Sequence, residues 1–164
     1  MPNSLEGLAR TLDLTPTELI FTLLREGATG AGVLVVVAFL LSRFIDDIYG
    51  RSLLGIFLFS AAGAYFGFAV GAWMSPLWML VELVQVVIFG TLALRSLRGS
   101  PYWLALGWAL HPVWDFVVHY IGPGHSFTPL IYAIAGVTFD WVVAAYIAIV
   151  YGFGLLRQCS PAPR

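Results

Sequence analysis

The stretch LLGIFLFSAAGAYFGFAVGAW, residues 53–73, contains no charged side chain and decides the fold class. About 20 consecutive apolar residues are enough for a helix to cross the ~30 Å hydrocarbon layer of a membrane. Four further apolar stretches of similar length lie around it, at residues 28–45, 77–94, 101–120 and 130–153. The pattern predicts an all-α membrane protein whose body is a bundle of five transmembrane helices.

The composition leads to the same class. Of the 164 residues, 60% are hydrophobic and only 10% are charged, whereas soluble domains carry about 25% charged residues. A short globular chain with this few charged residues could not cover its apolar surface in water. Lipid must therefore replace water around much of the protein. The net charge of −1 argues against a nucleic-acid partner, which would need a basic surface.

The N-terminal segment, residues 1–27, precedes the predicted bundle. Thr15, Pro16 and Glu18 form a capping-box pattern with proline at the first helical position. An apolar stripe follows, which predicts a short amphipathic helix lying on the membrane surface. The five-span bundle would then occupy residues 28–156, and residues 157–164 would form a short cytoplasmic tail.

The arginines predict the orientation of the bundle. In a five-span arrangement, six of them fall on one side: Arg43, Arg51, Arg95, Arg98, Arg157 and Arg164. Positive residues mark the cytoplasmic side of membrane proteins. We therefore expect an N-terminus outside and a C-terminus in the cytoplasm.

Small residues predict two packing faces. Gly63, Gly67 and Gly71 are four apart on the second predicted span, and this doubled GxxxG pattern lets another backbone approach closely. The partner is either another helix of the chain or a second protein, in a homo-oligomer or a membrane complex. On the last span Gly136 and Asp140 belong to a similar stripe, which places Asp140 against protein rather than lipid.

Polar side chains within the spans are the main functional signal. His111, Asp115 and His119 lie four residues apart on one helix, so they share one face. Such a face must point to the bundle interior or to a water-filled cavity.

Other spans and one loop carry further polar candidates. Glu82 and Gln85 lie on the third predicted span and Asp140 lies near the middle of the fifth, while the loop residue His125 could add an imidazole at the outer mouth. Thr128 with Pro129 predicts the cap that begins the fifth span. We expect these polar side chains to converge in the central and outer part of the bundle.

Pro112 predicts a distortion beside this cluster. Proline cannot donate a backbone hydrogen bond to the carbonyl of Trp108, and it disfavours helical geometry at His111. A kink there would leave a free carbonyl next to His111 and help to open a pocket.

Imidazole and carboxylate ligands suit zinc, iron or manganese. His111 and His119 are ~12 Å apart along a helix, too far to share one ion. A mononuclear site would combine Asp115 with either histidine, completed by Glu82 or Asp140 from another helix. A two-metal site bridged by Asp115 is a further arrangement. Haem or another tetrapyrrole ranks lower, because no CxxCH motif exists and no other span carries a histidine.

Three functions remain open from these residues. The leading hypothesis is a pocket, open toward the outer leaflet, that binds a metal ion or small ligand, with enzymatic activity left undecided. The competing hypothesis is a proton-coupled transporter or channel subunit, because stepped carboxylates and imidazoles carry protons through apolar protein. The third is an assembly subunit that acts through the Gly63–Gly67–Gly71 face.

The stretch GWALHPVWD, residues 107–115, with His119 and the later Asp140, resembles a family of small bacterial multi-pass membrane proteins of unknown function. That family has a His-x-x-Trp-Asp-x-x-x-His helix followed by an aspartate-containing span. The likeness covers roughly the C-terminal third, and this chain has Val118 where the family usually carries a second histidine. The resemblance implies a bacterial inner-membrane protein and supplies candidate residues, but no reaction.

Overall fold

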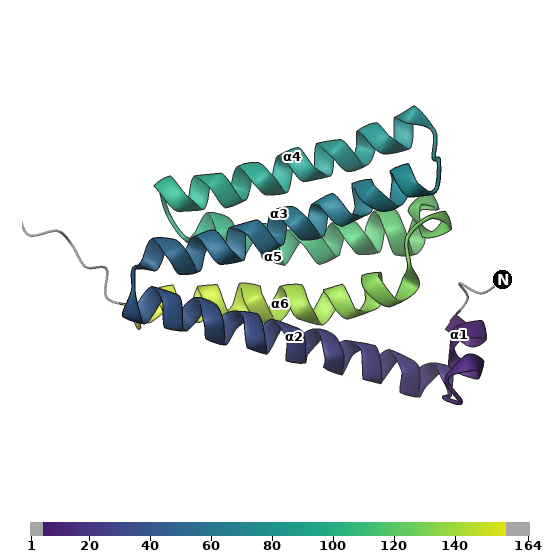
Figure 1. Cartoon of the computed structure of the whole chain (residues 1–164), viewed down its shortest axis with the longest axis horizontal. Helices are drawn as coiled ribbons and strands as arrows, with labels where there is room; N and C mark the ends of the chain where they lie inside the picture. Colours follow the sequence, from purple (N-terminus) through teal and green to yellow (C-terminus); the bar gives the residue numbers. More distant parts are fainter. Residues whose placement is uncertain (1–4, 157–164) are drawn as a thin grey trace, which may run out of the picture.

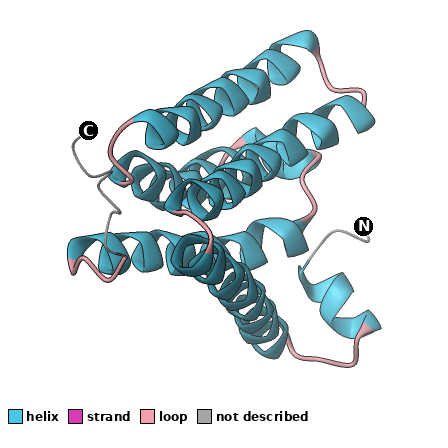
Figure 2. Ribbon diagram, turned by 60° about the vertical axis from the view of Figure 1, so that its left-hand side comes forward, coloured by secondary structure: helices cyan, strands magenta, loops and turns pink. Residues whose placement is uncertain are grey.

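The computed structural model describes residues 5–156, and every regular element in that range is a helix (Figures 1 and 2). In chain order these are α1 (Leu5–Thr11), α2 (Pro16–Phe44), α3 (Asp47–Gly71), α4 (Pro76–Arg98), α5 (Tyr102–Trp114), the π-helix η1 (Asp115–Ile121), the 3-10 helix η2 (Pro123–Ser126) and α6 (Leu130–Gly152). The predicted tail, residues 157–164, lies outside the described residues.

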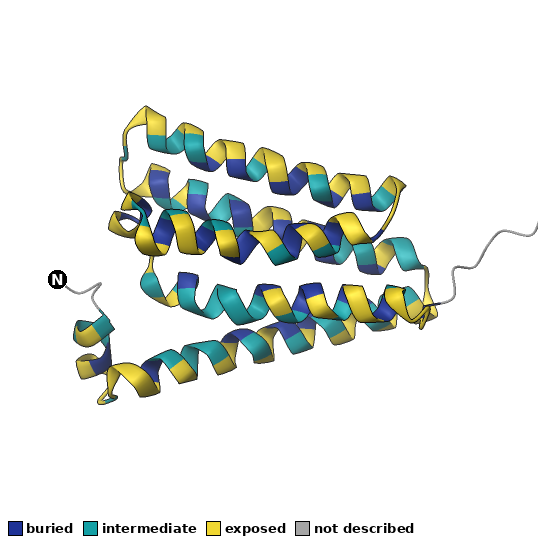
Figure 3. Ribbon diagram, turned by 180° about the vertical axis from the view of Figure 1, so that it is seen from behind, coloured by how far each residue is buried: buried dark blue, intermediate teal, exposed yellow. Residues whose placement is uncertain are grey.

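Four helices, α2, α3, α4 and α6, are long and apolar enough to cross a membrane. Their outward faces carry large apolar side chains such as Val33, Ile56 and Val87, and exposed residues follow the outer surface of the bundle in Figure 3. Polar side chains such as Glu82 and Asp140 are buried instead. This inverted distribution indicates an integral membrane protein in contact with lipid.

The beginning of α2 confirms the capping box. The Thr15 hydroxyl accepts a hydrogen bond from the Glu18 backbone N–H at 3.2 Å, and the Glu18 carboxylate accepts one from the Thr15 N–H at 2.8 Å. The separate amphipathic helix predicted after it is wrong, because α2 continues without a break to Phe44. The short helix α1, which the sequence did not predict, precedes α2.

Packing against α6 explains why α2 is continuous. The Thr138 hydroxyl donates to the Leu24 carbonyl at 2.6 Å, and a side chain at Gly27 would collide with the Ala135 carbonyl oxygen. Residues 24–27 are therefore fixed against another helix and form the first part of the bundle. The missing Cβ at Gly27 permits the close approach of the two helices.

The stretch predicted as one span at residues 101–120 is divided into α5 and η1. The helix continues through Pro112 and widens at Asp115, whose backbone N–H donates to the carbonyls of both His111 and Pro112. Proline removes one donor from the helical ladder, and π-helical turns are one way in which a helix accommodates such a loss. The predicted disturbance at Pro112 thus takes the form of a π-helix that begins three residues later.

The glycine face of α3 does not pack inside the described part of the chain. A Cβ at Gly63, Gly67 or Gly71 would meet nothing within 4 Å. The buried face of α3 consists of Gly50, Leu54, Gly55, Leu58, Ala62, Tyr65 and Ala69. One of the two predicted partners, another helix of the same chain, is therefore wrong within residues 5–156. By contrast, Gly136 lies against Asp115, because its Cβ would be 3.7 Å from Asp115 Oδ2.

Candidate metal centre

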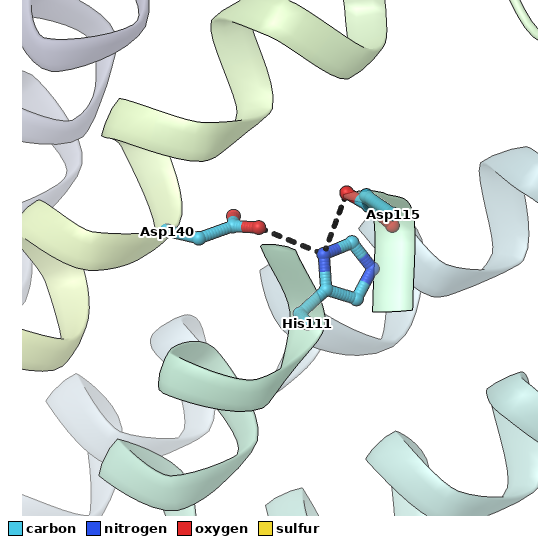
Figure 4. Close-up of side chains that lie close together, drawn as sticks. All are labelled: His111, Asp115 and Asp140. Carbon is cyan, nitrogen blue, oxygen red and sulfur yellow. Dashed lines mark hydrogen bonds and ion pairs between the residues drawn. The ribbon is translucent and has the colours of Figure 1, made fainter. Parts of the chain in front are cut away.

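The side chains of His111, Asp115 and Asp140 converge next to the apolar core (Figure 4). They come from two neighbouring segments, the continuous rod of α5 and η1, and α6. His111 Nδ1 is 2.8 Å from Asp140 Oδ2 and 3.4 Å from Asp115 Oδ2. His111 is on α5 and Asp115 begins η1, four residues later, whereas Asp140 comes from the middle of α6. One imidazole nitrogen thus faces two carboxylates.

The triad of His111, Asp115 and Asp140 is buried. These three residues are only 1–2% exposed, and Gly136 brings the backbone of α6 close to Asp115. His111 Nδ1 can donate only one proton, which the nearer oxygen of Asp140 accepts. Among residues 5–156 neither Asp115 oxygen nor His111 Nε2 makes a hydrogen bond of good geometry, although Asp115 also interacts with the Tyr65 hydroxyl. Two buried carboxylates that share one imidazole proton are costly, so the triad is suited to hold a further cationic or donating group.

His119 and Glu82 form a second group. His119 Nε2 is 3.5 Å from Glu82 Oε2, and both side chains are fully buried. The Thr128 hydroxyl lies 3.0 Å from His119 Nδ1. If this hydroxyl donates, His119 carries its proton on Nε2, directed at the Glu82 carboxylate. Glu82 thus pairs with the histidine of η1 and lies outside the triad.

Tyr65 of α3 separates the two groups. Its ring stacks on His119 with 4.1 Å between ring centroids, and its centroid is 5.9 Å from that of His111. The ring is fully buried, and its hydroxyl interacts with Asp115 without making a hydrogen bond of good geometry in the described part of the chain. Tyr65 therefore packs between the two imidazoles and fixes their positions.

The two remaining candidates from the sequence lie elsewhere. Gln85 is fully buried on α4, one turn from Glu82, and its amide atoms have no partner within the described residues. His125 is exposed on η2, where its Nδ1 lies 2.8 Å from the Gly122 carbonyl oxygen. The structure therefore brings Gln85 into the buried polar region and leaves His125 at the surface.

A cavity of about 570 Å³ adjoins the triad. His111, Asp115 and Asp140 line it on one side, and aromatic residues including Phe57, Phe68 and Phe139 line much of the rest. The triad is therefore next to an open, mostly apolar space, whereas Glu82 and His119 are not among the residues that line it.

The donor atoms of the triad fit a metal ion. One ligand atom from each residue lies within 4.8 Å of the other two, so small shifts would place all three at the ~2.0–2.2 Å that zinc requires from nitrogen and oxygen ligands. Two aspartates and a neutral imidazole carry two negative charges, which a divalent cation neutralises. This buried His/Asp group could therefore hold a metal ion.

The comparisons with known proteins identify a family. A family model described as a family of unknown function (DUF6010) matches residues 28–152. The chain belongs to this family. The DUF6010 match includes all three triad residues and agrees with the expected membership of an uncharacterised family. No curated protein and no solved structure matched the chain.

Sequence reasoning missed Tyr65 and assigned Thr128 another role. Tyr65 lies in the charge-free stretch among several phenylalanines, so it does not stand out from them in the sequence. Its hydroxyl in the middle of a span was the one signal that could have marked it as a candidate site residue. Thr128 was predicted to cap α6, but α6 has Pro129 at its N-cap and no side-chain cap. The Thr128 hydroxyl bonds His119 instead, so the cap prediction is wrong.

Proposed function

We propose that the chain is a five-span membrane protein whose His111–Asp115–Asp140 triad binds one divalent metal ion. The fifth crossing is the continuous rod of α5 and η1, residues 102–121. In Figure 1, α4 ends and α6 begins at opposite ends of the bundle, so the segment between them has to pass along its whole length. α5 has 13 residues and η1 adds 7, so only the two together are long enough to cross the membrane.

The proposed orientation places the arginine-rich end in the cytoplasm. Arg43, Arg51 and Arg98 line one polar cavity at that end, and Arg95 lies 5.0 Å from the ring of Trp103. Positive residues next to membrane spans are retained on the cytoplasmic side. The N-terminus, and the end of the bundle that carries η2, are then outside.

The observation that carries the metal proposal is the contact of one imidazole nitrogen with two buried carboxylates. His111 Nδ1 faces Asp115 and Asp140, so either a proton or a metal ion can occupy the space between them. A proton on Nδ1 satisfies Asp140 and leaves Asp115 with only a 3.4 Å contact to the imidazole and an interaction with the Tyr65 hydroxyl. A divalent ion engages all three side chains, which is why we favour it.

The ligand types limit the identity of the ion. One imidazole and two carboxylates form a 2-oxygen, 1-nitrogen set, which suits zinc, iron or manganese; no thiolate or thioether belongs to the triad. Three protein ligands leave at least one coordination position for an external oxygen or nitrogen atom.

Metal analysis of the purified protein tests the proposal. After replenishment with zinc, iron and manganese in turn, the parent chain should retain about one ion per chain, and Asp115→Ala should retain almost none. Asp47→Ala, which removes a carboxylate paired with Arg51 at 2.9 Å outside the triad, is the control. A parent chain that retains none of the three metals would contradict the proposal.

A proton path is the second candidate, favoured by the group formed by Glu82, His119 and Thr128. This group extends from the loop before α6 into the buried region where Tyr65 meets the triad. It predicts pH-dependent flux in liposomes, which Glu82→Gln and Asp140→Asn should abolish. Flux that is insensitive to both changes would exclude this function.

A further inference from the structure

The cavity beside the triad is open to the lipid side of the bundle. Phe57 on α3 and Ile131 on α6 line it and are each 44% exposed. Ser60 also lines the cavity and is exposed, and it lies near the middle of α3. Because Phe57 and Ser60 lie near the middle of the membrane-spanning helix α3, the opening beside them faces hydrocarbon rather than water.

The arrangement of the helices explains the opening. α2 and α3 are joined by a short loop and separate from there toward the N-terminal end of α2 (Figure 1), while α2 packs on α6 around Leu24 and Gly27. Tyr132 of α6 reaches across to α3, donating to the Ala61 carbonyl at 3.3 Å. The space that remains between α3 and α6 is the cavity.

The cavity is long and apolar, with one polar end. Its α3 wall runs from Phe57 to Phe68, a rise of about 16 Å, which is roughly half of the ~30 Å hydrocarbon layer. The triad lies at the level of Asp140, ten residues into the 23-residue helix α6, so the polar end is close to the middle of the membrane. A volume of about 570 Å³ is within the ~300–1,000 Å³ range of ligand sites.

We infer that this cavity binds a long-chain neutral amphiphile, with its terminal hydroxyl or carbonyl oxygen at the triad. This inference rests on the proposed metal site, because the oxygen would take the coordination position that the three side chains leave free. The alkyl or isoprenoid chain would lie along the apolar walls.

The depth of the triad selects the class of head group. The charged head group of a phospholipid stays at the membrane surface, and carrying it to mid-membrane is costly. A single neutral oxygen crosses hydrocarbon far more readily, and a neutral ligand keeps the charge balance of a divalent ion with two aspartates. The favoured ligands are therefore fatty or isoprenoid alcohols and aldehydes.

Photolabelling of the full chain in liposomes tests this inference. The probe is hexadecan-1-ol with a diazirine next to the hydroxyl-bearing carbon, and the matching probe without the hydroxyl is the chemical control. We expect the alcohol probe to label the cavity wall around Phe139 and Gly136, located by mass spectrometry, and unlabelled hexadecan-1-ol to suppress the labelling. The control probe should label the lipid-facing surface without this preference.

Two variants that fill the cavity make the test specific. Ser60→Trp and Ile131→Trp should each reduce labelling near Phe139 by at least about tenfold, while their metal content stays at the level of the parent chain. Ile56→Trp is the matched control, because Ile56 is 62% exposed on α3 and does not line the cavity.

The outcomes separate this inference from the metal proposal. Labelling that persists in both cavity variants, or that is spread evenly around the bundle, overturns the inference even if metal is bound. Specific labelling in a chain that binds no metal supports the apolar binding site. It overturns only the part of the inference in which the ligand oxygen coordinates a metal ion. Specific labelling together with bound metal supports both.

Discussion

His111 and Asp140, 29 residues apart in sequence, meet across α5 and α6 with 2.8 Å between Nδ1 and Oδ2. Both are almost fully buried, so the contact fixes the relative position of two membrane helices at the proposed metal site. Asp140→Asn keeps the shape of the side chain and removes its charge. We expect it to weaken metal binding by at least about 100-fold, since even indirect contacts to a metal contribute 10–100-fold.

A chelator competition assay on the purified protein measures this change. The control is Asp46→Asn, which makes the same chemical change at the N-cap of α3, where the side chain accepts from the Ile48 N–H at 2.9 Å and asparagine caps equally well. Equal metal affinity in Asp140→Asn and the parent chain would exclude Asp140 as a ligand.

The hydrogen bond between Thr128 and His119 predicts an effect on stability. Thr128→Val retains the shape of the side chain and leaves His119 Nδ1 buried without a partner, which should cost about 1–3 kcal/mol. Thr128→Ser keeps the hydroxyl and should remain close to the parent chain. Thermal unfolding in detergent micelles measures both, and a Thr128→Val variant as stable as the parent would show that the bond is not needed.

Two glycines on different helices should respond oppositely to alanine. At Gly27 a Cβ would collide with the Ala135 carbonyl and lie 2.6 Å from Thr138 Oγ1, so Gly27→Ala must separate α2 from α6 and should destabilise the fold by about 1–3 kcal/mol. At Gly67 the space is open, and alanine should be neutral or stabilise by about 0.5–1 kcal/mol. Thermal unfolding of the monomeric fraction measures both changes. A stability order with Gly67→Ala below Gly27→Ala would contradict the packing described for α2 and α6.

Cysteine labelling tests the fifth crossing and the orientation together. In a Cys159→Ser background, Ser126→Cys and Ser100→Cys place single thiols at exposed positions on either side of the rod formed by α5 and η1. A membrane-impermeant maleimide should label position 126 in intact cells and position 100 only after permeabilisation. Labelling of both from the same side would mean that this rod does not cross, and the reverse pattern would invert the bundle.

The sequence was sufficient to predict the membrane class, the capping box of α2 and the burial of Asp140. These features depend on local composition or on spacing along one helix. The pairing of Glu82 with His119 was not predictable, because it depends on how α4 is rotated relative to η1, and helical spacing carries no information on that rotation. For the same reason the sequence left Glu82 and Asp140 as equal candidates to complete the site.

The glycine pattern shows a second limit of sequence reasoning. Gly63, Gly67 and Gly71 have the spacing of a packing face, yet nothing within the described residues packs on them, whereas the close contact of α2 and α6 uses Gly27. The spacing shows that one face of the helix carries small residues. Whether another helix packs on that face depends on how the neighbouring helices are placed. The π-helix η1 was similarly hidden, since Pro112 predicts a disturbance of the helix but not its form.

X-ray absorption at the edge of the bound metal is the most direct test of the proposed centre. We expect a first shell of nitrogen and oxygen atoms only, at about 2.0–2.2 Å for zinc, with outer scattering from a single imidazole that His111→Ala removes. A sulfur shell, scattering from two imidazoles, or a spectrum unchanged in His111→Ala would contradict a site built from His111, Asp115 and Asp140.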